Sequence, residues 1–460
     1  MGKGKLITTS KPLILQSKLL CFSLLYLFTT LFLALYTTLS QSKCFFRSSP
    51  LDPIQSSLFY YPSSYGEHKY AVSTTRSTCS SPVNFSDYFD VVNEIKNWHR
   101  NFSSKPLRYM QGNADTFGGN FSTLVRLSYY DHQNDSTRVP CGFLKKFPIS
   151  DSDRIAMENC DRVVVVSAMF NDHDKIRQPK GLGSKTLENV CFFMFVDDVT
   201  LKGLELHGMI STNSGGYKIG VWRLVKVAKE DLYENPAMNG IIPKYLVHRL
   251  FPNSQFSIWM DAKLQLVVDP LLLIHSLVIS EDVDMAISKH PFYVHTMEEA
   301  MATARWKKWL DVNALKVQME TYCEHGLEPW SPSKNPYVSD VPDSALILRR
   351  HELGSNLFSC LMFNELDAFN PRDQLPFAFV RDHMKPNLKL NMFEVEVFEQ
   401  VTVEYRHNLK RIDRTITPKK VSPAGRTRRA HPDLLYANGS CCGSCQKYLS
   451  TMWGGEESND

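Results

Sequence analysis

An apolar segment near the N-terminus, Leu19 to Leu39, constrains this chain more than any other feature. About 20 apolar residues are enough to cross the roughly 30 Å hydrocarbon core of a bilayer as a helix. The short stretch before it has no acidic residue and contains Lys3, Lys5, Lys11 and Lys18. A lysine bias of this kind keeps the short flank on the cytoplasmic side. The pattern predicts a cytoplasmic tail at 1–18 and a transmembrane signal anchor at 19–39.

All glycosylation sequons follow this segment, at Asn84, Asn101, Asn120, Asn134 and Asn438. Such sequons are used only on the lumenal side of the secretory pathway. We therefore expect a single-pass type II protein of the Golgi membrane, with the endoplasmic reticulum as the other location. A cleaved signal peptide, cut near Ser40, is the alternative, although its apolar region usually has only 7–15 residues.

The composition of the chain limits the classes of molecule that we expect it to bind. The chain is 43% hydrophobic and 22% charged, as is typical of a globular protein, and its formal net charge is +4. No long basic run accompanies an aromatic platform, so we expect no nucleic acid partner. The basic strip at 410–429 is interpreted as a solvated or anion-facing surface. The expected partners are the membrane and a substrate.

Ten of the eleven cysteines follow the apolar segment. An oxidising lumen favours disulfides, and it does so for the cluster Cys441, Cys442 and Cys445, which otherwise has the residue types of half a zinc site. Cys191 and Cys360 lie in apolar runs and are also consistent with buried free thiols.

The remaining chain divides by composition. Residues 40–80 are rich in Ser, Pro and Tyr and predict a stem; 81–150 predict a glycosylated lead-in; 151–415 carry the periodic pattern; 416–460 form a basic, Cys-containing tail. The periodic part alternates short β-branched or aromatic runs with helical stretches, which predicts an α/β domain with a mostly parallel sheet flanked by helices. We expect strands at 162–167, 191–196, 220–227, 257–260, 284–288 and 345–348, and helices at 239–251 and 296–322.

Polar groups follow the predicted strands. Asp197 and Asp198 end one strand, and Asp261 and Lys263 end another. In open α/β sheets, ligands bind at the carboxyl ends of the strands. Aspartates there suit a hard divalent cation that bridges phosphates, but aspartates also cap helices and turns. We select Asp261 as a catalytic and metal-binding candidate, and Asp197, Asp198 and Lys263 as substrate- or nucleotide-binding candidates.

Lys263 stands where a second aspartate would complete an Asp-x-Asp metal motif. A lysine can pair directly with phosphate as a point charge, and so replace part of the charge of a metal. The sequence therefore does not determine a cofactor. Mn²⁺ or Mg²⁺ is expected only if the reaction transfers a sugar from a diphosphate.

A second constellation comprises Asn364-Glu365 and the run from Arg372 to Gln374. An acidic residue next to an amide, opening a helix near the acceptor, suits a general base or a ligand for sugar hydroxyls. We select Glu365 and Asp373 as catalytic candidates, and Arg372 and Gln374 as substrate-binding candidates. The alternative is a helix cap with a surface ion pair.

Several of these runs occur together in one order. In that order the chain resembles the plant glycosyltransferase-like family that contains the mucilage-related probable hexosyltransferase, over roughly residues 80 to 415. This resemblance implies a GT-A-like, nucleotide-sugar-binding fold. The runs that carry it are Val163–Ser167, Phe192–Asp198, Pro243–Leu246, Arg249–Pro252, Ser257–Lys263 and Arg372–Gln374.

One branch of this family, described as an alkaline ceramidase, also has a similar length, a short stem and a similar Met1–Leu6. That resemblance implies a Golgi hydrolase that converts ceramide to sphingosine and a free fatty acid and influences turgor. The alternative is a hexosyltransferase of cell-wall polysaccharide synthesis, with Asp261 and Lys263 at the diphosphate and Asp373 near the acceptor. A third interpretation is a lumenal scaffold without activity.

Overall fold

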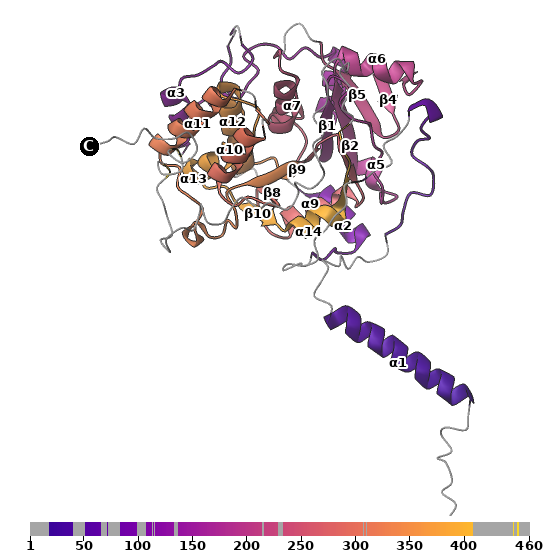
Figure 1. The fold of residues 1–460 in the computed structure, drawn as a ribbon. Helices are drawn as coiled ribbons and strands as arrows, with labels where there is room; N and C mark the ends of the chain where they lie inside the picture. The colour runs from indigo at the N-terminus through magenta and orange to yellow at the C-terminus, as the bar shows by residue number, and fades with distance from the viewer. Residues whose placement is uncertain are drawn as a thin grey trace, which may run out of the picture.

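The computed structural model describes residues 18–39, 51–65, 71, 83–98, 107–112, 114, 116–132, 137–213, 216–228, 233–306, 308–309, 311–407, 445 and 449. Helix α1 (Lys18–Leu39) is the apolar segment. Its Lys18–Tyr36 part has a mean hydropathy of 2.1 and is not buried, so it is long and apolar enough to cross a membrane. It lies outside the packed domain (Figure 1). The expected N-terminal apolar helix is confirmed.

The packed domain is built on one large mixed sheet. Nine strands follow the order β10-β8-β9-β6-β1-β2-β5-β4-β3, and β7 (Leu264–Leu266) pairs separately with β11 (Thr402–Glu404). The strands of the large sheet are β1 (Val163–Met169), β2 (Val190–Val196), β3 (Ser211–Asn213), β4 (Gly216–Ile219), β5 (Trp222–Lys226), β6 (Phe256–Met260), β8 (Met285–Lys289), β9 (Pro342–Arg350) and β10 (Leu390–Phe393).

Four of the eight neighbouring strand pairs described in this sheet are parallel and four are antiparallel, so the sheet is more mixed than the mostly parallel one that was expected. β1 runs parallel to both β2 and β6, β2 to β5, and β8 to β10. β9 runs antiparallel between β6 and β8, and β3, β4 and β5 form an antiparallel edge. Because β6 and β8 both oppose β9, the carboxyl ends of β1, β2, β5, β6 and β8 meet at the edge where β9 begins.

Helices cover both faces of the sheet, which explains why its central strands are continuously apolar. One core contains Val164, Phe193 and Trp259, and the other contains Val165, Phe192 and Ile258. Figure 1 shows the first group of helices gathered on the left and the second group below the sheet. The first group comprises α7 (Pro236–Tyr245), α10 (Thr296–Arg305), α11 (Val312–Glu324), α12 (Leu353–Ala368) and α13 (Phe377–His383); the second comprises α2 (Tyr88–Asn97), α9 (Pro270–Ile274) and α14 (Val395–Val401).

Some boundaries differ from the expected ones. The helix expected at 239–251 is divided into α7 and α8 (Val247–Leu250), and the helix expected at 296–322 is divided into α10 and α11. The strand expected at 220–227 begins two residues later, because Gly220 adopts a φ of 57° in the turn that joins β4 to β5. Glycine takes this conformation without steric cost.

Segments before the sheet pack against it. Tyr65, at the end of the 51–65 segment, is buried, and its hydroxyl accepts a hydrogen bond from the Ile176 amide. Phe117, Val139 and Phe147, from the predicted lead-in, belong to the first core. The shorter elements are α3 (Thr123–Leu127), α4 (Asp151–Glu158), α5 (Thr186–Asn189), α6 (Asp198–Leu206), the π-helical turn His275–Ile279 and the 3₁₀ turns Ser63–Tyr65 and Pro332–Lys334.

Three disulfides join distant parts of the described chain: Cys141–Cys360, Cys160–Cys191 and Cys323–Cys445. The interpretation of Cys191 and Cys360 as free thiols is therefore wrong. Each has its partner on a neighbouring element, at Cα separations of 6.2 and 4.6 Å, which an apolar run in the sequence does not reveal. Cys445 forms a disulfide as expected, whereas Cys441 and Cys442 lie outside the described residues.

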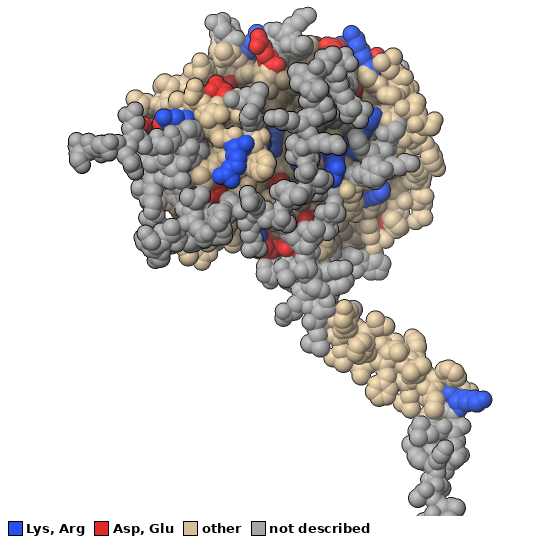
Figure 2. All heavy atoms as spheres, in the orientation of Figure 1, with Lys and Arg blue, Asp and Glu red and all other residues tan. Residues whose placement is uncertain are grey.

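Charges are dispersed on the face shown in Figure 2, where Lys and Arg side chains alternate with Asp and Glu side chains over the domain. The helix α1 carries no charge along its length except at its Lys18 end. Of the sequons, Asn84 and Asn120 are exposed, and Asn101, Asn134 and Asn438 lie outside the described residues.

Candidate functional site

The carboxyl end of β6 and the amino end of β9 bring together a cluster of charged side chains, which we call the strand-end site: Lys244, Asp261, Lys263, Asp343, Asp373 and Glu404. Lys244 comes from α7, Asp343 from β9, and Asp373 from the loop after α12. The pleat and direction of β6 place Asp261 directly beyond its last strand residue, as the sequence predicted.

Asp261 and Glu404 are both partly exposed carboxylates of this site, and Glu404 is already paired with Lys263. The Asp261 side chain is 32% exposed, and its Oδ1 accepts a 2.9 Å hydrogen bond from the Trp259 indole nitrogen. The ammonium of Lys244 lies 3.8 Å from the same oxygen. A carboxylate that is held by one donor and still reaches solvent can accept a proton from a bound water or hydroxyl group.

Lys263 is held in place by carboxylates. Its ammonium forms a 2.9 Å ion pair with Glu404. Burial alone would lower the pKa of Lys263, but the charges of Asp261, Glu404 and Asp343 outweigh burial and raise it above its usual value. Burial raises the pKa of Asp343, against the opposing charge of Lys263. Lys263 therefore keeps its positive charge well into the alkaline range.

The side chain of Asp373 is buried, and both of its carboxylate oxygens contact neighbouring side chains. Its carboxylate contacts the Lys244 ammonium at 2.7 Å and accepts hydrogen bonds from Ser344 at 2.9 Å and from the Tyr245 hydroxyl at 3.0 Å. Burial would raise the pKa of Asp373, but Lys244 and Ser344 outweigh it and lower the pKa. Through Lys244, the structure brings Asp373 beside Asp261. This geometry suits a group that positions Lys244.

The other residues of the second constellation lie elsewhere. Glu365 does not open a helix; it lies near the end of α12, because α12 already begins at Leu353. Its buried carboxylate binds Arg126 at 2.9 Å and accepts a hydrogen bond from the Tyr322 hydroxyl at 3.1 Å. Arg372 forms a 2.6 Å ion pair with Glu299.

Gln374 is half-buried, and its Oε1 has no hydrogen-bond partner among the described residues.

The two aspartates after β2 have local roles. Asp197 caps α6 by accepting from the Thr200 amide at 2.9 Å, and it accepts a second hydrogen bond from the Asn171 amide at 2.8 Å. Asp198 forms an exposed 2.7 Å ion pair with Lys226. Capping is the alternative that the sequence left open, and it accounts for both oxygens of Asp197.

Several residues of the site carried no signal in the sequence. Lys244 lies in an apolar helix, and Asp343 and Ser344 lie at the start of an antiparallel strand. Asp174 binds the imidazole of His407 at 3.0 Å, near the end of the described chain. Asp174 is different, because the polar group Asn171–Asp174 follows the first predicted strand and was visible in the sequence.

The donor set does not suit a divalent cation at Asp261. The position of a second aspartate is occupied by Lys263, and a second ammonium, that of Lys244, lies 3.8 Å from the Asp261 carboxylate. The two ammonium groups are paired with Asp373 and Glu404, and so already supply positive charge where a metal would. Elsewhere, Cys141, His248 and Cys360 place their ligand atoms within 4.8 Å of one another, but the two sulfurs are joined as a disulfide.

These features define an α/β protein with an N-terminal apolar helix and a charged strand-end site, and comparison with known proteins identifies its family. The chain belongs to the TOD1/MUCI70 family, whose glycosyltransferase-like domain matches residues 103–407. The resemblance seen in the sequence is thereby confirmed, over a slightly shorter range.

Two relatives come from Arabidopsis thaliana. The chain is 62% identical to "Alkaline ceramidase TOD1" over 99% of this chain and 100% of that protein. It is 38% identical to "Probable hexosyltransferase MUCI70" over 57% of this chain and 47% of that longer protein. Among solved structures, the apo form of mouse xyloside xylosyltransferase 1 overlaps over 50% of this chain and 85% of that chain, at 7% identity and a TM-score of 0.30.

Proposed function

We propose that this protein is an alkaline ceramidase that hydrolyses the amide bond of ceramide to sphingosine and a free fatty acid, and so influences turgor. We also propose that it is a glycosylated type II protein of the Golgi membrane. The observation that carries the proposal is the 62% identity, over almost the whole chain, to a protein named as an alkaline ceramidase. The apolar helix α1 supports it, since α1 would hold the domain beside its lipid substrate.

Amide hydrolysis needs an activated water and a group that stabilises the negative oxygen of the tetrahedral intermediate. In our proposal the Asp261 carboxylate takes a proton from water as the water oxygen bonds to the carbonyl carbon. The ammonium of Lys263 faces the oxygen that becomes negative. When the C–N bond breaks, the proton on Asp261 passes to the leaving nitrogen. The raised pKa of Lys263 supports this role, because the ammonium must stay protonated in alkaline solution.

The test uses the full chain in detergent micelles, incubated at alkaline pH with ceramide labelled in its acyl chain. We expect fatty acid release, and a loss of about a hundredfold or more in Asp261→Asn, since a positioned base contributes about 10²–10⁴-fold. Asp131→Asn, in an exposed ion pair with Lys385, is the matched control and should keep full activity. Absence of fatty acid release by the folded wild type would overturn the proposal.

The second candidate is hexosyl transfer from a nucleotide sugar. It is supported by the glycosyltransferase-like description of the family domain and by the relative named as a probable hexosyltransferase. Here Lys263 would face the diphosphate in place of a metal, Asp261 would lie beside it, and Asp373 would hold Lys244. Of the other candidates, Gln374 would border the acceptor, whereas Asp197, Asp198, Arg372 and Glu365 are engaged with partners within the protein.

A panel of nucleotide sugars, offered to the same preparation with and without a chelator, separates the two reactions. Sugar transfer or sugar-nucleotide hydrolysis that resists the chelator and is lost in Asp261→Asn, without fatty acid release, favours the second candidate. If Lys263 supplies the charge, EDTA leaves that activity unchanged.

A further inference from the structure

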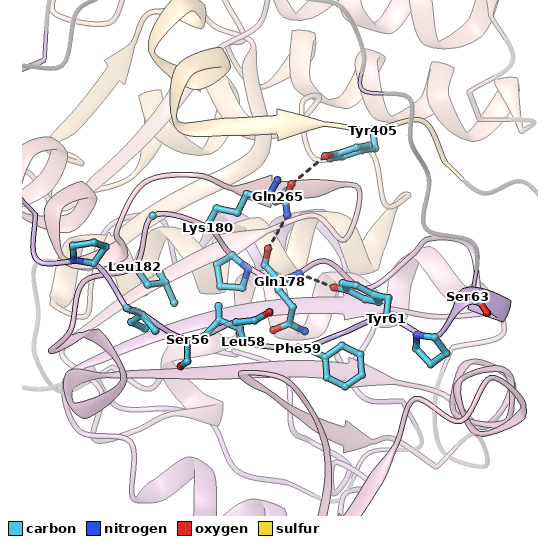
Figure 3. A pocket seen from close by; sticks show the side chains of 16 residues that line it. Ser56, Leu58, Phe59, Tyr61, Ser63, Gln178, Lys180, Leu182, Gln265 and Tyr405 are labelled. Atoms are coloured by element: carbon cyan, nitrogen blue, oxygen red, sulfur yellow. Dashed lines mark hydrogen bonds between the residues drawn. The ribbon is translucent and has the colours of Figure 1, made fainter.

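A pocket of about 900 Å³ lies between the 51–65 segment and residues 178–182 (Figure 3). Its volume falls within the usual range of ligand-binding pockets. Apolar side chains from both segments line it. In Figure 3, Leu58 and Phe59 lie on the lower side of the pocket, Lys180 and Gln265 on the upper side, and Leu182 at the left. Leu58 and Phe59 are half-buried and pack against the second core, so they form a wall and not a free surface loop.

The polar groups on the inner side of the pocket bind one another. The Tyr405 hydroxyl donates to Gln265 Oε1 at 3.0 Å, and Gln265 Nε2 donates to the Gln178 carbonyl at 2.8 Å. The Gln178 amide donates to the Tyr61 hydroxyl at 2.9 Å, and its side-chain oxygen accepts from the Val221 amide. Polar atoms that are satisfied in this way do not require a polar ligand, so a hydrocarbon can lie against them at little cost.

The pocket adjoins the strand-end site through the β7–β11 pair. Gln265 follows Lys263 by two residues on β7, and Tyr405 directly follows Glu404 on β11. The Tyr405 amide donates to the Lys263 carbonyl at 3.0 Å, and the side chains of Lys263 and Glu404 form the ion pair of the site. The 174–182 stretch also runs between the two, since Gln178 lines the pocket and Asp174 binds His407, whose charge interacts with those of Lys263 and Asp261.

The wall of the pocket is tethered close to the anchor. Helix α1 ends at Leu39 and the lining begins at Pro53. Those 14 residues span at most about 50 Å when fully extended, since each adds no more than 3.3–3.6 Å. The Ile54 amide donates to the Leu182 carbonyl at 3.1 Å, and the Ser184 amide donates to the Asp52 carbonyl at 2.7 Å. The segment that leaves the anchor is thus fastened to the domain as one wall of the pocket.

We propose that this pocket holds one hydrocarbon chain of ceramide while the amide group lies at Asp261 and Lys263. The inference rests on the proposed ceramidase function and adds its lipid subsite. Four features together fit a lipid chain: the apolar wall, the polar floor whose groups bind one another, the connection to the charged site through β7 and β11, and the 14-residue link to α1. Lys180 is the charged residue of the lining, and it is exposed. The buried part of the lining therefore carries no charge.

Photo-crosslinking tests binding without requiring turnover. The full chain, in detergent micelles, is irradiated with a long-chain ceramide that carries a diazirine in its acyl chain, and separately with one that carries it in the sphingoid chain. We expect at least one probe to label residues 51–65 or 178–182, with competition by unlabelled ceramide. Labelling confined to α1, or none in the domain, overturns the subsite.

Hydrolysis rates of pocket variants then test whether the enzyme uses this pocket for its substrate. Leu58→Trp fills the pocket from its half-buried wall, whereas Tyr60→Trp alters an 83% exposed neighbour outside the lining. We expect Leu58→Trp to lower kcat/KM for long-chain ceramide about tenfold or more, since each excluded methylene loses a few-fold in binding. Its kcat/KM for N-acetyl ceramide should change less than about twofold. Equal losses for both substrates would contradict the subsite.

The two proposals fail separately. Labelling of the pocket without hydrolysis leaves the lipid subsite standing and overturns the ceramidase function. If Leu58→Trp does not affect hydrolysis of long-chain ceramide and the pocket is not labelled, the lipid subsite is overturned and the ceramidase function stands.

Discussion

At the scale of single residues, the strand-end site is organised by two lysines. Lys244 reaches Asp373 at 2.7 Å, Ser344 at 3.2 Å and Asp261 at 3.8 Å, and so joins the two aspartates that the sequence selected. Lys263 forms its own pair with Glu404. Asp373 is buried behind Lys244, whereas Asp261 reaches solvent. From this difference in exposure we infer that Asp261 contacts the substrate, whereas Asp373 holds the Lys244 ammonium beside Asp261.

Replacement of Lys263 tests the charge at this site. We expect Lys263→Met to lower kcat by about a hundredfold or more, because a preorganised cation that faces a developing negative oxygen is typically worth about 10²–10³. The measurement is kcat and KM for the active substrate, together with a thermal unfolding curve. Lys185→Met, in an exposed pair with Glu188, is the matched control. Unchanged kcat in a folded Lys263→Met protein would remove Lys263 from the site.

His407 makes stability depend on pH. Its hydrogen bond to Asp174 raises the pKa of His407, against partial burial. A group whose pKa is higher in the folded state stabilises fully below its unfolded value, about 6.5, and loses that contribution as the pH rises through the folded value. We expect wild type to lose more thermal stability between about pH 6 and about pH 9 than His407→Gln does. Parallel losses in both proteins would show that the pair contributes nothing.

At the scale of elements, the sequence predicts the strands and the residues that directly follow them. It does not predict the residues that tertiary packing brings to the site from other elements. Asp261 and Lys263 were predictable because they follow β6, and parallel strands end at one edge. Lys244 and Asp343 were not predictable. Lys244 points out of a helix that otherwise reads as apolar, and Asp343 reaches the edge only because β9 runs antiparallel between β6 and β8. That direction depends on the tertiary arrangement and not on any local pattern.

The sequence predicts disulfides but not their pairing, and the disulfides are expected to contribute strongly to stability. Cys160–Cys191 closes a loop with a sequence separation of 31, from the end of α4 to the second residue of β2. Chain-entropy arguments assign about 3–4 kcal/mol to a loop of this size. We expect the double variant Cys160→Ala/Cys191→Ala to lose about that much unfolding free energy under non-reducing conditions. Cys21→Ala, in α1, controls for thiol removal, and a loss equal to it would contradict the expectation.

The contact of α12 with α3 depends on the Arg126–Glu365 pair, whose side chains are only 5% and 1% exposed. Removal of one partner from a buried pair typically costs about 3–5 kcal/mol. We expect Glu365→Ala to lower stability by that order, and Glu320→Ala, in an exposed pair with Lys316, to lower it by less than about 1 kcal/mol. If Glu365→Ala instead stays stable and loses turnover, Glu365 acts in catalysis.

At the scale of the whole molecule, the 51–65 segment that follows α1 in the chain is connected through the packed domain to the strand-end site. The segment that leaves α1 is fastened beside residues 178–182, which connect through β7 and β11 to Lys263 and Glu404. The domain boundary expected at residue 80 does not mark a break in packing, because Tyr65 is already buried against Ile176. A substrate drawn from the bilayer would therefore meet the segment nearest to its source.

This arrangement works only if the domain and the membrane face from which the lipid is drawn are both lumenal. We expect the domain to resist added protease in sealed microsomes and to be digested once detergent opens them, because lysines precede α1 and all sequons follow it. Asn84 and Asn120 are both exposed, so each variant, Asn84→Gln and Asn120→Gln, should remove one glycosidase-sensitive gel shift. An opposite orientation would expose the domain to protease without detergent and leave both asparagines unmodified. Protease resistance with unmodified asparagines would keep the topology and remove only the two sugars, so the pair of measurements separates orientation from glycosylation.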